Sequence, residues 1–368
     1  MNEDRYGLRV PVNEKRVIKG RGSLSNPAGR LAKTTCVAED DGWETPDDES
    51  FPSPDPRTEF FPDQTRNIIA TNSSPDIPFD QSINPFKGCE HGCIYCYARP
   101  THAYLDLSPG LDFETKIFVK TKPVERLRKA FEAPGYECKV LAIGTNTDPY
   151  QPGEKIHRIT RRLLETLLEF RHPVSITTKG KLILRDLDLL RELADNGLAS
   201  VAVSITTLDD ALKAKLEPRT ASPRARLRIV RELAGAGIPV GVMMAPVIPF
   251  INDHEIEDVV ARSADAGAAA VHYIMLRLPF EVKDLFAEWL AEHYALKAEH
   301  VMNRLRDLHG GKPYRAEWGA RMRGRGPYAD LVANRFKLAR RRHGLEGSRL
   351  PALRTDLFRR PFEQHSLL

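Results

Sequence analysis

Three of the five cysteines of this 368-residue chain lie within eight residues, and this spacing constrains the chain more than any other feature. They are Cys89, Cys93 and Cys96, spaced C-x3-C-x2-C in the segment 88–97. Three thiols that converge on one loop indicate a metal site. Because nothing in the sequence indicates secretion, a disulfide framework is not expected. The sequence therefore predicts a metal bound by this loop.

Two kinds of metal site fit such a loop. Iron–sulfur clusters take cysteine thiolates, usually four, and structural zinc takes a closed set of four ligands. The loop supplies three thiols, while Cys36 lies far upstream in a polar segment and Cys138 stands alone before an apolar stretch. Three protein ligands leave one metal position open for a substrate or cofactor. We favour an iron–sulfur cluster, and the alternative is a Cys3His zinc site that uses His91 or His102.

The motif resembles the signature of radical S-adenosylmethionine (radical SAM) enzymes, in which an aromatic residue precedes the last cysteine. Three flanking segments are similar to the spore photoproduct lyase-related, DNA repair photolyase-like branch of that superfamily. The resemblance covers about residues 81–280 and is greatest to a bacterial subgroup of the branch. The segments are Asn84-Pro85, Cys96-Tyr97-Ala98-Arg99 and Thr145-Asn146-Thr147-Asp148-Pro149-Tyr150.

This resemblance implies an enzyme with two cofactors. Cys89, Cys93 and Cys96 would bind three irons of a [4Fe–4S] cluster, and S-adenosylmethionine would chelate the fourth. One-electron reduction, from a donor such as ferredoxin or flavodoxin, would then cleave S-adenosylmethionine to methionine and a 5′-deoxyadenosyl radical. The protein's part is to orient the cofactor and to exclude competing reactions.

Five residues are candidates to bind S-adenosylmethionine. Lys179 can pair with the methionine carboxylate as a point charge. Thr147 can hydrogen-bond the amino group, and Ser204 the carboxylate or ribose; the resemblance places these three where the branch holds its cofactor. Arg219 is a further carboxylate candidate, and Tyr95 would pack against adenine. A strand-end lysine, a turn threonine and a core serine bonded to backbone are the ordinary structural explanations.

Hydrogen transfer is the point at which the chain departs from spore photoproduct lyase. In that enzyme a cysteine after the second strand donates hydrogen to the product radical, and the matching position here is Thr145, a poor hydrogen-atom donor. Cys138 precedes that strand and is expected at the opposite end of the barrel. Tyr97 matches a tyrosine of the lyase's radical relay and is our candidate catalytic residue. Repair of the spore thymine dimer is therefore not expected, and Tyr150 or the substrate itself can complete another reaction.

Strand-like and helix-like patterns alternate about six times between residues 81 and 280, which predicts parallel strands joined by right-handed crossovers. The expected fold is α/β, a partial (β/α)6 TIM-like barrel that the radical SAM resemblance also implies. Active sites of such barrels lie at the carboxyl ends of the strands. The expected strands are 81–85, 116–120, 139–144, 174–178, 200–205, 240–244 and 270–274, and the expected helices are 123–132, 158–170, 186–196, 222–236 and 253–266.

Composition divides the chain into a polar, partly disordered N-terminal extension (1–80), the barrel (81–280) and a helical, basic C-terminal extension (281–368). Apolar residues are too sparse in the first part to offset its ordering entropy. Residues 19–23, Lys-Gly-Arg-Gly-Ser, can touch phosphates or pack over the core, but their composition favours a flexible, solvated arm. Phe60-Phe61 can anchor the extension onto the barrel.

Positive charge gathers near the C-terminus. Residues 301–368 carry 16 basic and 6 acidic side chains, whereas residues 1–80 carry 10 basic and 15 acidic ones. The basic clusters 321–325 and 337–342 are interleaved with aromatic residues, which suits phosphate contacts and base stacking by a nucleic acid. A helix with a solvated arginine face explains the same residues. The aromatic residues are Tyr314, Trp318, Tyr328 and Phe336.

Three functions fit these observations. The first is a radical SAM enzyme that repairs or modifies nucleic acid, and the second is a radical SAM enzyme that modifies a protein or peptide. The third is a zinc-stabilised nucleic-acid-binding protein without catalysis. With no run of eighteen apolar residues and no apolar core of a signal peptide, the chain is expected to be cytoplasmic and free of membranes.

Overall fold

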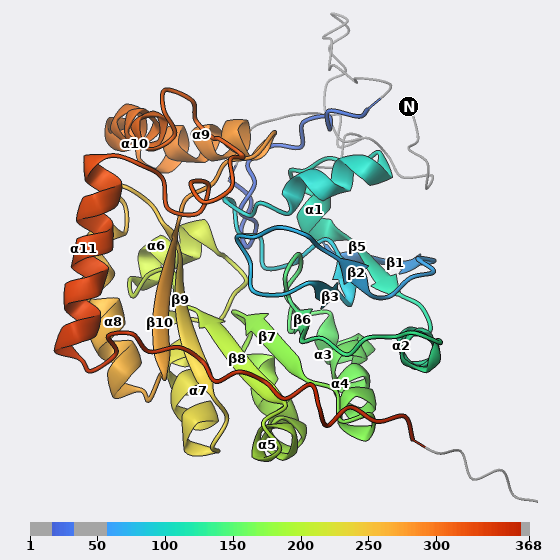
Figure 1. The fold of residues 1–368 in the computed structure, drawn as a ribbon. Helices are drawn as coiled ribbons and strands as arrows, with labels where there is room; N and C mark the ends of the chain where they lie inside the picture. Colours follow the sequence, from blue (N-terminus) through green and yellow to red (C-terminus); the bar gives the residue numbers. More distant parts are fainter. Residues whose placement is uncertain (1–16, 33–56, 362–368) are drawn as a thin grey trace, which may run out of the picture.

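The computed structural model describes residues 17–32 and 57–361 of the chain. Its centre is a seven-stranded sheet with helices packed around it (Figure 1). The strands of this sheet are β2 (Ala70–Thr71), β3 (Gln81–Ile83), β6 (Leu141–Ile143), β7 (Val174–Thr178), β8 (Ala199–Ser204), β9 (Val240–Val247) and β10 (Ala270–Met275).

Six of these strands are parallel. They follow the order β10-β9-β8-β7-β6-β3, and β2 pairs antiparallel with β3 at the edge. Within the described part of the chain β10 and β2 do not pair, so the sheet is a partial barrel and not a closed one. This confirms the predicted α/β partial barrel.

Helices connect the parallel strands, and neighbouring helices pack on each other: α2 on α4, α4 on α5, and α7 on α8. The bounds of the predicted helices lie close to the observed ones, because the apolar residues of a helix recur with its period over the length that it packs on the sheet. The helices are α1 (Asp112–Thr115), α2 (Pro123–Glu132), α3 (Glu154–His157), α4 (Ile159–Glu169), α5 (Leu187–Asp195), α6 (Asp210–Leu216), α7 (Pro223–Gly235), α8 (Ile256–Asp265), α9 (Val282–His293), α10 (Ala295–Leu308) and α11 (Pro327–Arg342), with three 3-10 helices, η1 (Arg99–Leu105), η2 (Lys181–Asp186) and η3 (Asp253–Glu255).

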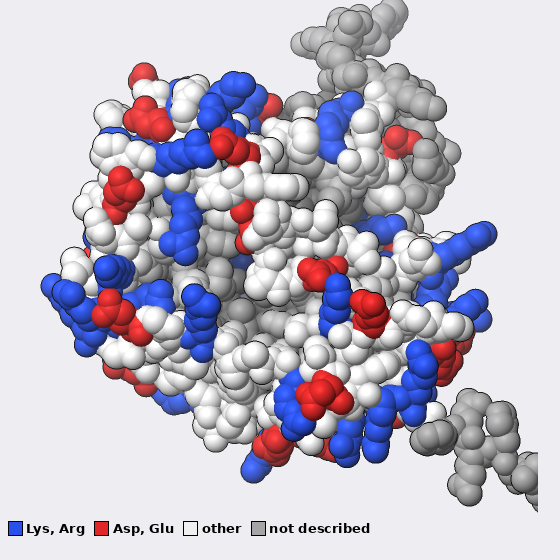
Figure 2. Space-filling model, in the orientation of Figure 1, with Lys and Arg blue, Asp and Glu red and all other residues white. Residues whose placement is uncertain are grey.

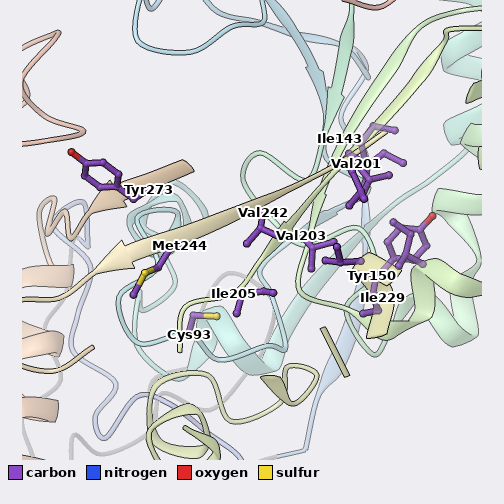
Figure 3. Packing of buried hydrophobic residues seen from close by; sticks show 14 of the residues in the cluster. Cys93, Ile143, Tyr150, Val201, Val203, Ile205, Ile229, Val242, Met244 and Tyr273 are labelled. Carbon is purple, nitrogen blue, oxygen red and sulfur yellow. The ribbon is translucent and has the colours of Figure 1, made fainter. Parts of the chain in front are cut away.

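The core lies on both faces of the sheet and is built from the β-branched residues that predicted the strands. Val201 and Val203 of β8 and Val242 of β9 are fully buried, and Figure 3 shows them stacked beside one another. Ile205, which follows β8, extends this layer toward Cys93 (Figure 3). The cysteine loop is therefore packed directly onto the hydrophobic interior.

The expected strand 116–120 forms, but it does not join the barrel. It is β5 (Lys116–Lys120), which lies in a separate three-stranded sheet of order β1-β5-β4. The alternation of polar and apolar residues predicts a strand but not its partner, which depends on contacts distant in sequence. The other two strands of this sheet are β1 (Glu59–Asp63) and β4 (Phe86–Lys87).

The described part of residues 1–80 is folded against the rest of the chain. β1 pairs parallel with β5, and Phe61 packs on Phe118 with ring centroids 5.4 Å apart. Phe60 packs against His157, 4.7 Å between ring centroids, so this pair of phenylalanines does anchor the segment. The Pro- and Asp-rich stretch and Cys36 lie outside the described residues, and the boundaries at residues 80 and 280 stay predictions.

The flexible arm expected for residues 19–23 is wrong for the second half of that stretch. Arg21 is 6% exposed and Ser23 is fully buried. Their backbone and side-chain groups bond to the carboxylate and carbonyl of Glu114, a residue distant in sequence. The prediction was wrong because composition does not show which polar groups find hydrogen-bond partners. Polar groups are buried only where such partners satisfy them, and here the partners come from a distant part of the chain.

The C-terminal extension is helical as far as α11 and then extended. α11 packs on α8, and residues 349–361 run along the amino ends of the strands (Figure 1). Arg354 N–H bonds the Gly197 carbonyl, and Arg360 bonds the carbonyls of Phe131 and Ala133. Four of the sixteen basic residues of 301–368 therefore lie at the end of the barrel opposite to the cysteine loop, namely Arg349, Arg354, Arg359 and Arg360.

Base stacking by Phe336 is ruled out by its packing. Phe336 is 2% exposed and stacks on Tyr273 of β10, with ring centroids 4.3 Å apart. The hydroxyl of Tyr328 bonds Asp253, whereas Trp318 is 58% exposed. In the described residues no helix is long and apolar enough to cross a membrane.

Asp63 holds the small sheet together. Its carboxylate binds Lys87 of β4 at 3.0 Å and Lys120 of β5 at 3.1 Å. Burial alone would raise the pKa of Asp63, but hydrogen bonds from Thr65 and the charges of Lys120 and Lys87 hold it well below its usual range. The carboxylate therefore stabilises the fold above the unfolded pKa near 3.8, and this stabilisation is lost as pH falls through the lower folded value.

We expect Asp63→Asn to lower the free energy of unfolding by about 2 kcal/mol at pH 7, because two charged donors lose their acceptor. The variant should also lose less stability than the wild type when pH falls below about 4, the range in which the unfolded carboxyl takes up its proton. Urea unfolding measures both effects. Asp80→Asn is the control, since Asp80 forms a surface pair with Lys139 in which both side chains are exposed. Equal effects of the two substitutions would contradict the role of Asp63.

Candidate functional site

The cysteine loop connects β4 to η1 and is fixed by backbone hydrogen bonds. Cys89 N–H donates to the Phe113 carbonyl at 2.8 Å, and Cys96 N–H donates to the Cys93 carbonyl at 3.2 Å. Ile94 N–H bonds the Leu216 carbonyl, which ties the loop to the end of α6. Cys93 lies beside Ile205, just past the carboxyl end of β8 (Figure 3).

The three thiols are free and lie close together. Cys89 and Cys93 are each 8% exposed, and Cys96 is partly buried against the hydrophobic clusters to which these two cysteines belong. Burial raises the pKa of the Cys93 thiol to about 12, and burial followed by the charges of Asp148 and Cys93 raises the pKa of Cys89. A bound metal cation would instead lower the pKa of these thiols, because it stabilises the thiolates. Three thiols are the donor type that iron–sulfur clusters take, although within the described residues no three His, Cys, Asp or Glu side chains are already gathered in an arrangement that could hold a metal ion.

A buried ion pair supports the loop from behind. Arg99 and Glu114 are both fully buried, and their side chains are 2.5 Å apart. Arg99 Nε donates to the Cys93 carbonyl at 2.9 Å, so the pair fixes the middle cysteine. The other carboxylate contacts come from the backbone N–H groups of Gly22 and Ser23, at 3.0 and 2.9 Å.

Gly22 touches the loop directly. A Cβ at this position would lie 1.8 Å from the carbonyl oxygen of Gly92, which stands between the first two cysteines. Gly92 has a φ of +67°, a conformation that favours glycine. The N-terminal segment and the cysteine loop therefore approach each other at a point where neither has room for a side chain.

Glu90 fixes the other side of the loop. Its carboxylate accepts hydrogen bonds from Gly153 N–H at 2.6 Å and from the Thr58 hydroxyl at 2.9 Å. Arg219, a predicted cofactor residue, pairs with the same carboxylate at 3.1 Å. The guanidinium of Arg219 is thus already engaged by a carboxylate, and its backbone N–H bonds the His91 carbonyl.

Three predicted cofactor residues follow adjacent strands. Thr147 comes after β6, Lys179 follows β7, and Ser204 ends β8. The Thr147 hydroxyl donates to the Phe86 carbonyl at 2.9 Å and keeps its lone pairs for a donor. Within the described residues the Ser204 hydroxyl has no hydrogen bond although the residue is 4% exposed. Because carboxyl ends of parallel strands meet at one edge, the fold gathers all three.

Lys179 is held at its backbone and free at its ammonium. Its N–H donates to the Asp148 carboxylate at 2.7 Å, which also accepts from the Thr178 hydroxyl. In the described part of the chain the ammonium forms no ion pair, and it lies 6.0 Å from the centroid of the Tyr95 ring. Burial alone would lower the pKa of Lys179, but the charges of Cys93 and Glu217 outweigh burial. The pKa is therefore raised, and the side chain is a cation.

Tyr95 belongs to a buried polar network. Its hydroxyl bonds the carboxylate of Glu217 and lies 3.2 Å from the Thr206 hydroxyl. Glu217 pairs in turn with Arg226, whose guanidinium also donates to the Ser204 carbonyl at 3.0 Å. With its hydroxyl engaged, Tyr95 can contact a ligand only through its ring or backbone.

Tyr97, the predicted catalytic residue, lies at the mouth of the barrel. It is 46% exposed, and its hydroxyl donates to the carbonyl of Thr145. The guanidinium of Arg277 lies 4.5 Å from the ring centroid.

The two histidines of the zinc alternative have other partners. His91 Nδ1 lies 3.3 Å from the Asp148 carboxylate, and His102 Nε2 lies 3.0 Å from the Lys116 carbonyl. Burial, partly opposed by the hydrogen bond to Lys116, lowers the pKa of His102 to about 4. Tyr150 is 2% exposed and lies near Ile229, apart from Cys93 (Figure 3), which argues against it as a hydrogen donor.

Sequence reasoning missed several residues of this site. Arg277 follows β10 as Lys179 follows β7, and the same strand-end rule finds it. Asp148 stood in a quoted motif without an assigned role. Glu114 and Arg99 gave no signal, because a buried ion pair 15 residues apart is indistinguishable in sequence from two surface charges.

Comparisons with known proteins agree with this geometry. The model of the radical SAM superfamily matches residues 83–262. An uncharacterised protein of Mycobacterium tuberculosis (strain H37Rv) is 38% identical over 240 residues, which are 65% of this chain and 69% of the relative. An uncharacterised protein of Methanocaldococcus jannaschii is 29% identical over 173 residues, 47% of this chain and 62% of the relative.

Solved structures of spore photoproduct lyase have a similar fold. The lyase complexed with dinucleoside spore photoproduct has a TM-score of 0.55 and 19% identity, with 77% of this chain and 79% of the lyase covered. A mutant of the lyase in which one cysteine is replaced by alanine gives a TM-score of 0.55 at 18% identity, with 77% and 78% covered. At this identity the likeness concerns the fold.

We expect Gly22→Ala to loosen the cysteine loop, because the added methyl group displaces the N-terminal segment from Gly92. In metal-free protein the thiols of Cys89 and Cys93 should then react severalfold faster with a thiol reagent. Gly235→Ala is the matched control, since a Cβ there meets nothing within 4 Å. Unchanged thiol reactivity in the Gly22 variant would contradict the contact.

Proposed function

The chain belongs to the radical SAM superfamily, whose members are enzymes that use a [4Fe–4S] cluster and S-adenosylmethionine, and we propose that Cys89, Cys93 and Cys96 hold its cluster. The observation that carries this proposal is the set of three free thiols on one loop at the carboxyl end of the barrel. When bound, the reduced cluster would supply the electron that cleaves S-adenosylmethionine to methionine and a 5′-deoxyadenosyl radical.

We assign S-adenosylmethionine to the polar groups beside this loop. The Lys179 ammonium would pair with the methionine carboxylate, since it is a cation with no ion pair among the described residues. The Ser204 hydroxyl would hydrogen-bond the carboxylate or ribose, and Thr147 would accept from the amino group through its open lone pairs. A bound ligand would complete hydrogen bonds that these side chains do not make within the described residues. Arg219 is a weaker candidate because Glu90 already binds it.

Tyr97 is positioned to act on the substrate side of the site. Its hydroxyl is oriented by the Thr145 carbonyl, and its ring is held by Arg277. We propose that Tyr97 exchanges a hydrogen atom with the substrate or product radical, in place of the cysteine that this chain lacks at Thr145. Arg277 acts as a positioning residue for that ring.

The substrate class we propose is nucleic acid, for repair or modification. Two exposed aromatic rings follow the cysteine loop and β10: Tyr104 is 68% and Phe280 65% exposed, and the Arg30 guanidinium, which pairs with Glu281, lies 5.3 and 4.3 Å from their centroids. Exposed rings interleaved with arginine suit unpaired bases. Figure 2 shows further Lys and Arg side chains over α11 and beside the central hollow of this face. Modification of a protein or peptide is the alternative, because tyrosine and arginine are also common in protein interfaces.

An electron donor is a required partner of this chemistry. We propose a one-electron protein donor such as ferredoxin or flavodoxin, which would dock where the cluster is reached by the shortest path.

We expect anaerobic reconstitution with iron and sulfide, followed by reduction, to give protein that forms 5′-deoxyadenosine from S-adenosylmethionine. Cys93→Ala should retain markedly less iron and form none. Cys138→Ala is the matched control, because this thiol is half-buried at the amino end of β6 and should affect neither measurement. Binding of zinc without iron, and no cleavage, would contradict the proposed function and favour the binding protein without catalysis.

We expect Lys179→Gln to weaken S-adenosylmethionine binding by about tenfold or more, because a charge-assisted hydrogen bond is lost. Isothermal titration against the reconstituted protein measures this, and the iron content should stay at the wild-type value. Lys181→Gln is the control, since Lys181 is exposed two residues further on at the start of η2. Similar affinities of the two variants would remove Lys179 from the site.

A further inference from the structure

A second pocket lies outside the barrel, between β10 and α11. Its volume is about 370 Å³, within the range of about 300–1,000 Å³ that is usual for small-molecule sites. None of the cysteine-loop or cofactor residues lines it. The charged and aromatic residues in its lining are His272, Tyr273, Arg323, Phe336, Lys337, Arg340 and Glu346.

Three of the lining residues are cations whose charge no carboxylate neutralises. Within the described residues neither Arg323 nor Lys337 forms an ion pair, and Arg323 lies 5.0 Å from the Tyr273 ring centroid. Arg340 donates to the carbonyls of Leu345 and Ser348, each at 3.1 Å, so its positive charge is retained.

Nearby arginines of the same extension behave differently. Arg321 pairs with Asp76, and Arg335 pairs with Glu257, both at 2.5 Å. Three cations without a carboxylate partner thus line the pocket, although Arg341 and Arg342 of α11 also form no ion pair within the described residues. Glu346 is the one acidic residue in the lining, against three basic ones.

Tyr273 adds a hydrogen-bond donor to the wall of the pocket. Its residue is 6% exposed, its ring stacks on Phe336, and its hydroxyl has no hydrogen-bond partner in the described structure. Figure 3 shows this side chain directed away from Cys93 and the core residues of β8 and β9. Burial raises the pKa of Tyr273 despite the lowering effect of Arg323, so the hydroxyl keeps its proton. A buried donor of this kind needs an acceptor.

The pKa of His272 is affected by the positive charges around the pocket. Burial lowers its pKa, and the charges of Arg340, Arg323 and Arg349 lower it further. Three arginines thus act on one lining residue, and His272 is neutral at pH 7. The pocket therefore attracts anions through charge that does not depend on protonation near neutral pH.

We propose that this pocket binds a phosphate ester, with Arg323, Lys337 and Arg340 around the phosphate and the Tyr273 hydroxyl as a further donor. Arginine and lysine are the usual phosphate ligands of proteins. The volume exceeds that of a lone phosphate, so a nucleotide unit is the fitting size, either free or within a nucleic-acid strand. The inference concerns a second site and stands whether or not the cysteine loop holds a cluster.

The test compares two double variants of the full chain. The pocket variant, Arg323→Gln with Lys337→Gln, removes two cations from the lining. The control variant, Arg341→Gln with Arg342→Gln, removes two exposed cations from the last turn of α11, outside the lining. The ligands are inorganic phosphate and AMP, followed by calorimetry, and a fluorescent oligothymidylate, followed by anisotropy. Thermal unfolding checks that the variants fold.

We expect the pocket variant to bind AMP or the oligonucleotide about tenfold more weakly or worse, and the control variant to change less than about twofold. If the ligand is a nucleic-acid strand, the logarithm of its affinity should fall less steeply with the logarithm of the salt concentration in the pocket variant, by an amount that corresponds to about two phosphate contacts. Loss of AMP binding alone identifies a free nucleotide, and loss of oligonucleotide binding alone identifies a strand. Equal losses in both variants, or no binding of any ligand by the wild type, would overturn the proposal.

A second substitution tests the donor without changing charge. Tyr273→Phe removes only a hydroxyl that has no partner in the described structure, so stability should be unchanged or slightly higher while affinity falls severalfold. A merely structural role of Tyr273 would change thermal stability and leave affinity as it is. Formation of 5′-deoxyadenosine by the same proteins separates failure of this pocket from failure of the proposed function.

Discussion

The buried pair of Arg99 and Glu114 is the interaction on which the candidate site depends. Two charges removed from water are stable only where every remaining donor and acceptor is satisfied. Here Arg99 binds the carbonyls of Cys93, Pro109 and Gly110, and Glu114 binds the backbone of residues 22 and 23. The pair thereby joins the N-terminal segment, η1 and the cysteine loop, so the glycine-rich loop is fixed by groups of the protein itself.

A second buried network links this loop to the strand ends. Glu217 accepts from Tyr95, Thr206 and Arg226, and Arg226 reaches the carbonyl of Ser204. Burial raises the pKa of Glu217, but Arg226 and Lys179 lower it to about 2, so the carboxylate is charged at every working pH. In the described part of the chain these paired groups surround the Lys179 ammonium, which forms no ion pair, and the Ser204 hydroxyl, which forms no hydrogen bond. This contrast is what a preorganised cofactor site requires, because the ligand completes hydrogen bonds that the protein leaves open.

The two ends of the barrel have different roles. At the carboxyl ends of the strands lie the cysteine loop, Tyr97 and Arg277. At the amino ends, residues 349–361 cover the barrel, with Phe358 packed between Phe131 and Phe170. The basic tail is therefore not one surface: part of it is structural, part is paired with carboxylates, and part lines the pocket beside β10. Net charge in the sequence predicts affinity for anions but not where an anion binds.

The sequence alone determined the barrel, the cysteine loop and the strand-end candidates, since hydrophobic periodicity fixes which residues are buried and parallel strands carry their carboxyl ends to one edge. Only the tertiary structure decided which polar residues are bound to other protein groups. Residues 21–23 are buried and do not form a free arm, and β5 belongs to a separate sheet. Arg219 is paired with Glu90, and Phe336 is packed against Tyr273 of β10. Burial of a polar residue depends on partners far away in the chain, and that information is absent from local composition and spacing.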